Sequence, residues 1–322
     1  MSRRAVLVTT GSRLHFGLFA FGQPGTREFG GVGAMVDAPA VRLRMTAADR
    51  LSTEGPSAEI ALRHAERVAE ADWFNRAGLC RIEILETPPA HVGLGSGTQL
   101  ALAVAEGMTA LFNLPEPATA ALAQTLGRGR RSAVGLYGFF HGGLIAEAGK
   151  SAESEVAPLL CRVPIPTQWR FLLVRQANCE GLSGEAERRA FEGLPAVSLE
   201  ASARMCREAM LGLLPAAMEG RFDLFSQALY RYGQEAGRCF APQQGGVFAT
   251  SLAEATVDEL RRLGVVGVAQ SSWGPTIFAA LPSEETARQV RTQLSEGPLG
   301  RDVTSQIVCA LNEPARVEVL DG

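Results

Sequence analysis

A glycine-rich turn constrains the fold of this chain more than any other segment. It spans residues 88–99 and reads Pro-Pro-Ala-His-Val-Gly-Leu-Gly-Ser-Gly-Thr-Gln. Alternating apolar residues from Leu79 to Leu85 predict a strand before the turn, and apolar residues at helical spacing from Leu100 to Leu111 predict a helix after it. Glycines within the turn permit positive φ and a close approach of the backbone. The segment therefore predicts a strand, a tight turn and a helix whose N-terminus opens on that turn.

The start of this helix is an expected anion-binding site. Free N–H groups and the positive end of the helix dipole face the turn, and Ser96 and Thr98 are expected to cap the helix and add hydroxyl donors. The turn is neither a Walker loop, because no lysine follows the glycines, nor a dinucleotide-binding motif, because the glycine spacing differs. A plain strand-to-helix turn without a ligand is the alternative. The expected phosphate-binding residues are Gly93, Leu94, Gly95, Ser96, Gly97 and Thr98.

Length and charge bound the remaining possibilities. A chain of 322 residues exceeds the usual size of one domain. A polar, proline-containing stretch near residues 150–166 predicts a division into domains at 1–157 and 158–322. The net charge of −3, without long runs of one sign, gives no electrostatic case for a nucleic acid or a membrane as partner. Small-molecule substrates are expected instead.

Cysteine and lysine usage indicates compartment and chemistry. The six cysteines show no CxxC pairing and lie mostly among apolar residues, which favours free thiols in a reducing compartment. The N-terminal segment begins as a strand, without an apolar targeting stretch, so a cytoplasmic protein is expected. Lys150 is the only lysine, so arginines are expected to bind any anionic ligand.

The order of predicted elements indicates an α+β protein. Strands are expected at 5–9, 14–16 and 32–45, followed by helices at 58–72 and 117–126 around the glycine-rich turn. In the second half, residues 264–269 and 276–281 are expected to form a hairpin. Antiparallel pairing is therefore expected in the second domain.

Three segments carry side chains suited to binding or catalysis. Arg13 and His15 follow the first predicted strand, and Arg128, Arg130, Arg131 and Ser132 crowd a helix boundary. His141 stands before two glycines at the mouth of a strand, where an imidazole can serve a ligand. The alternatives are a turn with a satisfied histidine and a solvated helix end.

Two polar turns complete the set of candidates. Ser183 and Gly184 lie at the start of a predicted helix, where the serine is a typical N-cap. Ser271, Ser272 and Trp273 form a polar turn between apolar strands, which packing alone does not explain. All five are expected substrate-binding residues.

The glycine-rich turn resembles the Pro-x-x-x-Gly-Leu-Gly-Ser-Ser loop of the GHMP kinase superfamily, matched from Pro89 to Ser96, with Gly97 in place of the second serine. Together with the segments around Arg13, Arg131, His141 and 271–276, it is similar to the β-ribofuranosylaminobenzene 5′-phosphate synthases of methanopterin biosynthesis. The resemblance implies a two-domain α+β fold. The N-terminal domain is expected to be like domain 2 of ribosomal protein S5, and the C-terminal domain to be ferredoxin-like.

The same resemblance implies an enzyme that condenses 5-phosphoribosyl 1-diphosphate with 4-aminobenzoate and releases CO2 and diphosphate. It also implies Mg²⁺ as the companion of the diphosphate and a homodimer. Features that the superfamily's kinases use for phosphoryl transfer are missing: Gly97 replaces a serine, no Met-Asp-Gln-like segment supplies a catalytic aspartate, and residues 271–275 replace a glycine-rich loop.

Residue roles follow from the resemblance as expectations. The turn would hold diphosphate, Arg130 and Arg131 with Ser132 a phosphate, and Arg13 or Arg175 the benzoate carboxylate, while metal ligands stay unassigned. Two alternatives stay open: a small-molecule kinase that uses ATP, with Asp37 as its catalytic carboxylate, and a non-catalytic protein that binds phosphorylated metabolites. The expected catalytic residues are His15, His141 and Arg131, with either histidine handling a proton.

Overall fold

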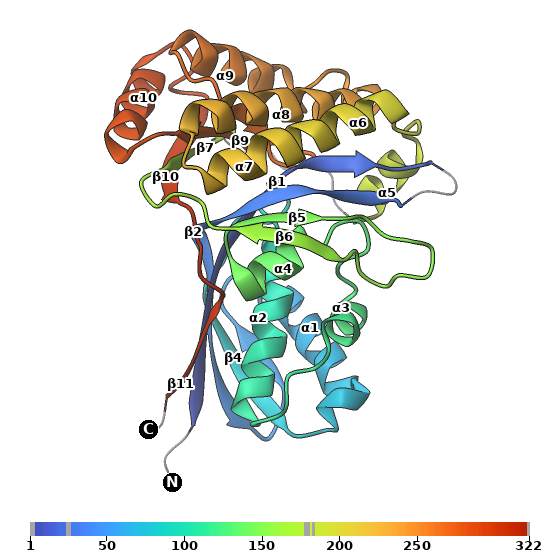
Figure 1. Cartoon of the computed structure of the whole chain (residues 1–322). Coiled ribbons are helices and arrows are strands. Elements are labelled where there is room, and N and C mark those ends of the chain that lie inside the picture. Colours follow the sequence, from blue (N-terminus) through green and yellow to red (C-terminus); the bar gives the residue numbers. More distant parts are fainter. Residues whose placement is uncertain (1–3, 24–26, 177–180, 182–183, 321–322) are drawn as a thin grey trace.

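The computed structural model describes residues 4–23, 27–176, 181 and 184–320 (Figure 1). The chain folds into two α+β parts. A seven-stranded sheet with helices α1 to α4 forms the lower part in Figure 1, and a four-stranded sheet with helices α5 to α10 forms the upper part. The α+β class and its two-domain form, expected from the sequence, are confirmed.

Two long antiparallel strands join the two parts. β1 (Ala5–Ala20) pairs with β2 (Phe29–Ala48) along most of its length, with register shifts near Thr10 and His15. Side chains of the first half of β1 pack in the lower core, and those of its second half pack in the upper core. The separate strands expected at 5–9 and 14–16 are thus one continuous strand, because the backbone absorbs its glycines at irregularities in the ladder.

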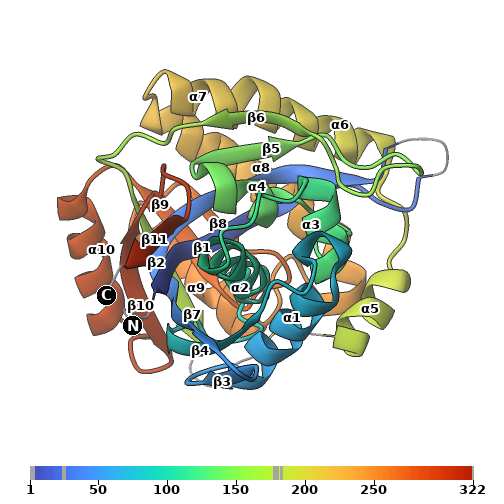
Figure 2. The ribbon, with the colours of Figure 1, turned by 90° about the horizontal axis from the view of Figure 1, so that it is seen from below.

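The lower core is closed by helices on one face of the large sheet. α2 (Ser96–Leu111) is apolar around nearly its whole circumference, so it is buried between the sheet and α1 (Figure 2). The other elements here are β3 (Ser52–Glu54), α1 (Ala58–Glu70), η1 (Asp72–Phe74), β4 (Leu79–Glu86), α3 (Thr119–Leu126) and α4 (Val134–His141).

Two strands that follow residue 157 in the sequence belong to the first sheet. β6 (Leu159–Val163) pairs with β5 (Leu144–Glu147), which pairs with β2, and β11 (Arg316–Leu320) pairs with β1. The domain division expected after residue 157 therefore cuts through the hydrogen-bonded sheet. A local composition shift marks the crossover but carries no signal for strands that return to an earlier partner.

The four-stranded sheet has the order β10-β7-β9-β8 and is antiparallel throughout. Its alternating residues face two cores: Leu172 and Val174 pack against α9 and α10, and Phe171 and Leu173 pack toward α6 and α8. The expected hairpin is present as β8 and β9. The elements here are β7 (Arg170–Gln176), α5 (Gly184–Glu192), α6 (Leu199–Glu208), η2 (Ala209–Leu213), α7 (Leu214–Met218), α8 (Phe222–Gln244), α9 (Ser251–Arg262), β8 (Val268–Gln270), β9 (Ile277–Leu281), α10 (Glu284–Glu296) and β10 (Val303–Cys309).

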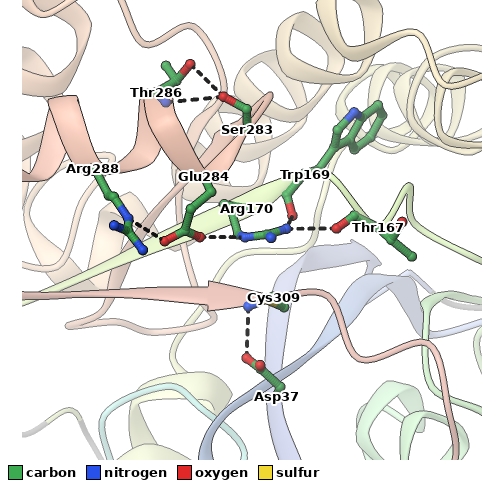
Figure 3. A network of polar contacts seen from close by, with 9 residues as sticks. All are labelled: Asp37, Thr167, Trp169, Arg170, Ser283, Glu284, Thr286, Arg288 and Cys309. Atoms are coloured by element: carbon green, nitrogen blue, oxygen red, sulfur yellow. Dashed lines mark hydrogen bonds and ion pairs between the residues drawn. The ribbon is translucent and has the colours of Figure 1, made fainter.

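Polar contacts hold the two sheets at their junction. An Asp37 carboxylate oxygen on β2 accepts a hydrogen bond from the Cys309 amide of β10 at 2.8 Å (Figure 3). Beside it, Glu284 bridges Arg170 and Arg288, with 2.8 Å to each guanidinium. Asp37 therefore serves the junction between the sheets.

The structure also describes the state of the cysteines and the character of the helices. Cys80, Cys161, Cys206, Cys239 and Cys309 are free thiols, and Cys179 lies outside the described residues. None of the helices in the described part of the chain combines the length and the apolar character needed to cross a membrane.

Candidate active site

A two-lobed cleft opens at the N-terminus of α2. Its larger cavity has a volume of about 460 Å³ and its smaller one about 240 Å³. The glycine-rich turn lines the larger cavity, whereas Ser132 and Phe240 line the smaller one. Residues shared by the two linings are Arg13, Thr98, Arg128, Glu187, Ser272 and Trp273. The two cavities therefore form one continuous site.

The glycine-rich turn leaves helix amides available to a ligand. Gly95, at φ 71°, is the N-cap of α2, and no side chain caps the helix. The expectation that Ser96 and Thr98 cap it is thus wrong, because both residues lie inside the helix. The amides of Thr98 and Gln99 donate to the Gly95 carbonyl, at 3.0 and 3.1 Å. The amides of Ser96 and Gly97, in the first turn, have no acceptor within the helix, and both residues line the larger cavity.

The turn at residues 271–276 fixes the position of the glycine-rich turn. Ser271 Oγ donates to the Gly93 carbonyl at 2.7 Å, and Thr276 Oγ1 donates to the Val92 carbonyl at 2.6 Å. A Cβ on Gly93 would lie 2.5 Å from the Ser271 carbonyl oxygen, so only glycine fits there. Ser271 is therefore a supporting residue, while Ser272 and Trp273 line the cleft itself.

β1 brings Arg13 and His15 to the same place. The Arg13 amide donates to the Leu94 carbonyl at 2.9 Å, and the His15 amide donates to Ser271 Oγ at 3.0 Å. The Ser272 amide returns a bond to the His15 carbonyl at 2.9 Å. The strand and the two turns thus lock together, which explains why segments far apart in sequence form one site.

The Arg13 guanidinium lies under the turn with unused hydrogen-bonding capacity. A Cβ on Gly95 would lie 3.4 Å from Arg13 Nε, which is buried and has no hydrogen-bond partner. Burial lowers the Arg13 pKa to about 10, and the charges of Glu147 and Glu187 oppose this shift. Arg13 therefore carries its positive charge at neutral pH and can stabilise an anion.

His15 is buried and neutral. Burial and the Arg13 charge lower the pKa of His15 well below its ordinary value. Its Nε2 lies 3.0 Å from Ser132 Oγ, at the edge of the smaller cavity. The imidazole is therefore a hydrogen-bonding group, and it can accept a proton only when a ligand supplies one under favourable geometry.

Glu147 is a buried carboxylate behind this pair that the sequence did not single out. Its Oε2 accepts a hydrogen bond from the Ala133 amide at 2.7 Å. Burial raises its pKa to about 7, although the Ala133 bond and the Arg13 charge favour the ionised form. Glu147 can therefore hold or release a proton near neutral pH.

The arginines at positions 128, 130 and 131 lie at different places in the cleft. Arg131 Nη2 pairs with Glu187 of α5 at 2.8 Å, and its guanidinium carbon lies 4.9 Å from the centre of the Phe191 ring. Exposed Arg130 lines the smaller cavity with Ser132. Arg128 approaches the glycine-rich turn instead: a Cβ on Gly97 would lie 3.3 Å from its Nη2. Within this run the arginine nearest the turn is Arg128, whereas the sequence assigned phosphate binding to Arg130 and Arg131.

Helix α1 contributes further basic groups that the sequence did not predict for the site. Arg63, His64 and Arg67 line the larger cavity, and Arg128 Nη2 lies 3.2 Å from His64 Nε2. Burial and the neighbouring arginine charges lower the His64 pKa to about 3, so the ring is neutral. The signal was present as basic residues on one face of a predicted helix, but only tertiary packing places that face beside the turn.

An aromatic wall bounds the smaller cavity. The rings of Phe240 and Trp273 lie with centroids 4.7 Å apart, and those of Phe191 and Trp273 lie 6.3 Å apart. Leu18 completes the apolar lining. This lobe suits a planar aromatic ligand, while the larger lobe suits anions.

Some expected residues lie elsewhere. His141 is exposed at the end of α4, where its ring stacks on Tyr137, and it lines neither cavity. Arg175 is a residue of β7 in the four-stranded sheet and also lines neither cavity. Gly184 begins α5, and Ser183 lies outside the described residues.

The cleft offers few metal ligands of its own. No group of three or more His, Cys, Asp or Glu side chains in the described ranges is arranged to hold a metal ion. Glu187 is the one carboxylate among the described lining residues. The hydroxyls of Ser96 and Thr98 lie on the same lining. These donors fit an Mg²⁺ ion that takes most of its ligands from phosphate and water.

Two family models match this chain. The model described as "GHMP kinases N terminal domain" matches residues 59–143, and "GHMP kinases C terminal" matches residues 213–298. Together they cover more than half of the sequence, including the glycine-rich turn. The chain belongs to the GHMP kinase superfamily.

Two curated relatives share one name and match most of this chain. The "Beta-ribofuranosylphenol 5'-phosphate synthase" of Archaeoglobus fulgidus is 28% identical over 96% of this chain and 98% of the relative. The protein of the same name from Methanothermobacter thermautotrophicus is 26% identical over 85% of this chain and 88% of the relative. Their name specifies a phenol product, where the resemblance seen in the sequence implies an aminobenzene.

Solved structures share the fold. Mevalonate pyrophosphate decarboxylase from Streptococcus pyogenes aligns with a TM-score of 0.69 at 13% identity, covering 98% of this chain and 99% of that one. Homoserine kinase from Cytophaga hutchinsonii aligns with a TM-score of 0.65 at 16% identity, covering 98% and 97%. A structure described as "MDDEF in complex with MVAPP, AMPPCP and Magnesium" aligns with a TM-score of 0.68 at 12% identity, covering 99% and 100%.

Proposed function

We propose that this protein is a decarboxylating phosphoribosyltransferase of methanopterin biosynthesis. It would condense 5-phosphoribosyl 1-diphosphate with 4-aminobenzoate or the corresponding 4-hydroxybenzoate. The observation that carries the proposal is the two-lobed cleft, in which a lobe rich in cations and free amides adjoins a lobe with an aromatic wall. The curated relatives, matched over nearly the whole chain, support it.

The proposed reaction balances without a covalent enzyme intermediate. The bond between ribose C1 and the diphosphate oxygen breaks, and the diphosphate keeps the electron pair. The ring carbon that bears the carboxylate bonds to C1. The bond from that carbon to the carboxylate then breaks, its electrons restore the aromatic ring, and CO2 leaves. The enzyme's task is therefore to stabilise departing negative charge and to orient two reactants.

The residues of the turn would bind the diphosphate. The amides of Ser96 and Gly97 and the buried Arg13 guanidinium converge on the same part of the cleft. Charge-assisted hydrogen bonds of this kind strengthen as the C1–O bond breaks, because negative charge accumulates on the diphosphate. Arg13 is thus proposed to be catalytic in this role, in preference to the role of holding the benzoate carboxylate.

His15 and Ser132 would serve the aromatic acceptor in the smaller lobe. An amino or hydroxyl group opposite the reacting carbon donates electrons to the ring, and it does so better when a neighbour accepts its proton in a hydrogen bond. Neutral His15, with Ser132 at 3.0 Å, is such a neighbour. Arg130 and Arg131 are proposed to meet the carboxylate before it is lost.

Mg²⁺ is the proposed companion of the diphosphate, supported by one structural neighbour that is described as a complex containing magnesium. When bound, it would neutralise charge on the leaving group. Ser96, Thr98 and Glu187 are the residues that would hold it, together with the diphosphate itself.

A homodimer is also proposed, and sedimentation equilibrium tests it.

Asp37, the candidate catalytic carboxylate of the kinase alternative, lies outside the cleft. Asp37 lies at the junction between the sheets and lines neither cavity, so it is not placed to activate an alcohol. Glu187 does face the cleft, but it pairs with Arg131. A non-catalytic binding protein would use the same anion-binding lobe, so turnover separates it from the proposed enzyme.

The deciding experiment measures CO2 from carboxyl-labelled benzoates. Purified protein, 5-phosphoribosyl 1-diphosphate and Mg²⁺ are incubated with labelled 4-aminobenzoate or 4-hydroxybenzoate, beside an ATP-consumption control. We expect release of labelled CO2 that depends on the sugar diphosphate, and the faster benzoate identifies the acceptor. ATP turnover on a small alcohol without CO2 release would restore the kinase alternative, and no turnover in either assay would favour a binding protein.

A further inference from the structure

Four basic side chains line the larger cavity, and one of them, Arg128, also lines the smaller one. Arg63, His64 and Arg67 come from α1, and Arg128 comes from the segment between α3 and α4. We call them the α1 basic cluster. The three arginine charges act together on His64, which is only 4% exposed. The proposed roles for the turn, Arg13 and the smaller lobe do not use this cluster.

The cluster makes no ion pair in the described part of the protein, and the charge that opposes it at Arg128 is that of Glu187. None of its three arginines makes an ion pair with a carboxylate there, whereas Arg131 next to it pairs with Glu187. Arg128 Nε and His64 Nδ1 are buried without a hydrogen-bond partner. Cations held together in this way repel one another, and an anion in the cavity relieves that repulsion.

The start of α1 adds to the positive potential. Ser57, the N-cap residue of this 13-residue helix, lines the cavity, and its side chain does not cap the helix. Ser57, Ile60, His64 and Arg67 lie on one face of α1, so a continuous stripe of the helix borders the cavity. Residues at the starts of α1 and α2, among them Ser57 and Ser96, thus line the same cavity.

We propose that the α1 basic cluster is a phosphomonoester subsite, distinct from the diphosphate subsite formed by the glycine-rich turn and Arg13. Its identification as the site of the substrate's 5-phosphate rests on the proposed function. The two ends of a ribosyl diphosphate that also bears a 5-phosphate are both anionic, and the larger cavity offers two sets of anion-binding groups. Arg128, which touches the turn and His64, lies between the two subsites.

This assignment sets the direction of the substrate. With its 5-phosphate on α1 and its diphosphate on the turn, the ribose spans the larger cavity. C1, which carries the diphosphate, then lies nearest Arg13, a residue that lines both cavities. The anomeric carbon therefore faces the aromatic lobe, as attack by a ring carbon requires. A ligand with only one phosphorylated end would fill one subsite and leave the other empty.

Binding of the two half-ligands separately tests the subsite. Isothermal titration calorimetry measures ribose 5-phosphate and inorganic diphosphate with Mg²⁺ against the wild type, Arg67→Gln and Arg128→Gln. Arg63 and Arg67 are exposed, so an Arg63→Gln/Arg67→Gln double variant is expected to fold even if Arg128→Gln does not. Arg44→Gln, an exposed position of β2 that lines neither cavity, is the matched control for lost charge.

We expect the cluster variants to weaken ribose 5-phosphate binding by about tenfold or more, the loss typical of a charge-assisted hydrogen bond. Diphosphate affinity should change by less than about threefold in Arg67→Gln and in the double variant, and Arg44→Gln should leave both affinities unchanged. Unchanged ribose 5-phosphate affinity in the double variant, or equal losses for both ligands, would overturn the subsite.

The same measurement separates this inference from the proposed reaction. Cluster-dependent ribose 5-phosphate binding without CO2 release would leave the subsite in place and reject the synthase. Normal CO2 release with full affinity for the sugar diphosphate in the double variant would support the synthase and reject the subsite. In an active enzyme, the subsite further predicts a raised KM for the sugar diphosphate in Arg67→Gln, with kcat changed much less.

Discussion

Arginines play opposite parts in two regions of this molecule. On the outer helices, Arg204 and Arg238 share Glu235, and Arg231 pairs with Glu208, at distances of 2.5 to 3.1 Å. In the cleft, Arg13 and Arg128 are more deeply buried yet make no ion pair within the described ranges. The arginines of the cleft, which are less accessible to solvent, therefore have fewer carboxylate partners than the arginines of the outer helices.

This difference indicates where the protein retains binding capacity. On the outer helices, each of these arginine charges is paired within the fold. Solvent and salt screen such exposed pairs, so the loss of one arginine changes the free energy of unfolding little. In the cleft, burial without a partner costs stability, as the lowered pKa values of both arginines record. An incoming polyphosphate supplies the missing partner, so we expect substitutions in the cleft to affect ligands far more than substitutions on the helices do.

The largest effect is expected at Arg13. Replacing it with Gln removes the buried charge under the glycine-rich turn but keeps a polar side chain. We expect kcat/KM for the sugar diphosphate to fall by roughly 100-fold or more, because loss of one preorganised donor to a developing anion commonly costs that much. Steady-state CO2 release measures the change.

Thermal denaturation provides the control for Arg13→Gln. Since the guanidinium is buried without an ion pair, its removal should leave the midpoint within a few degrees of the wild type or raise it. A variant that stays folded with unaltered kcat/KM would show that Arg13 does not touch the reacting substrate.

Glu147 is expected to give a smaller effect, on stability rather than catalysis. Burial raises its pKa from 4.5 to about 7, so the folded state binds this proton more tightly than the unfolded state does. The resulting stabilisation is complete below about pH 4.5 and is lost as the pH rises through 7. Glu147→Gln keeps the acceptor for the Ala133 amide and removes the titration. Its stability relative to the wild type should therefore rise between pH 5 and pH 8, on the order of 3 kcal/mol.

Urea denaturation at the two pH values checks this difference. The neutral variant should be the more stable protein at pH 8 and nearly equal to the wild type at pH 5. A constant difference across this range would show that Glu147 does not change its protonation state between pH 5 and pH 8.

Local sequence was enough to predict the glycine-rich turn, because its geometry depends on neighbouring residues. Glycines at 93 and 95 adopt positive φ, and the strand and helix on either side follow their apolar spacing. The hairpin of β8 and β9 was predictable for the same reason. The expected site residues that line the cleft are those of the turn at 93–98, Arg13, His15, Arg130, Arg131, Ser132, Ser272 and Trp273.

Features that depend on long-range packing were not predictable. Nothing near residues 316–320 indicates pairing with β1, and nothing near His64 indicates an arginine from residue 128 at 3.2 Å. Glu147 reads as an ordinary residue at the end of a strand, yet the fold buries it behind Arg13. His141 illustrates the converse: it lies in a suggestive motif, but the end of α4 points it to solvent.

Arg131 lies between the two extremes, since it borders the cleft but already has a carboxylate partner. Arg131→Ala removes the 2.8 Å pair with Glu187 and the contact with Phe191. We expect about a tenfold loss in kcat/KM, expressed mainly as a higher KM for the benzoate, because one charge-assisted contact to the carboxylate disappears. If kcat/KM for either substrate is unchanged within about twofold, Arg131 serves only to hold α5 in place.

The smallest effect is expected for Arg204→Gln on the outer helices. Its guanidinium is more than half exposed and pairs with Glu235 at 3.1 Å, while Arg238 still neutralises that carboxylate at 2.5 Å. Unfolding free energy should change by less than about 1 kcal/mol, and kcat/KM should not change. Arg204→Gln and Arg13→Gln replace the same type of residue with the same residue in the same protein. The two variants therefore differ in the region where the arginine lies. If both variants lost similar activity, the contrast between compensated and uncompensated arginines would not explain ligand binding, and the general positive potential of the molecule would have to do so.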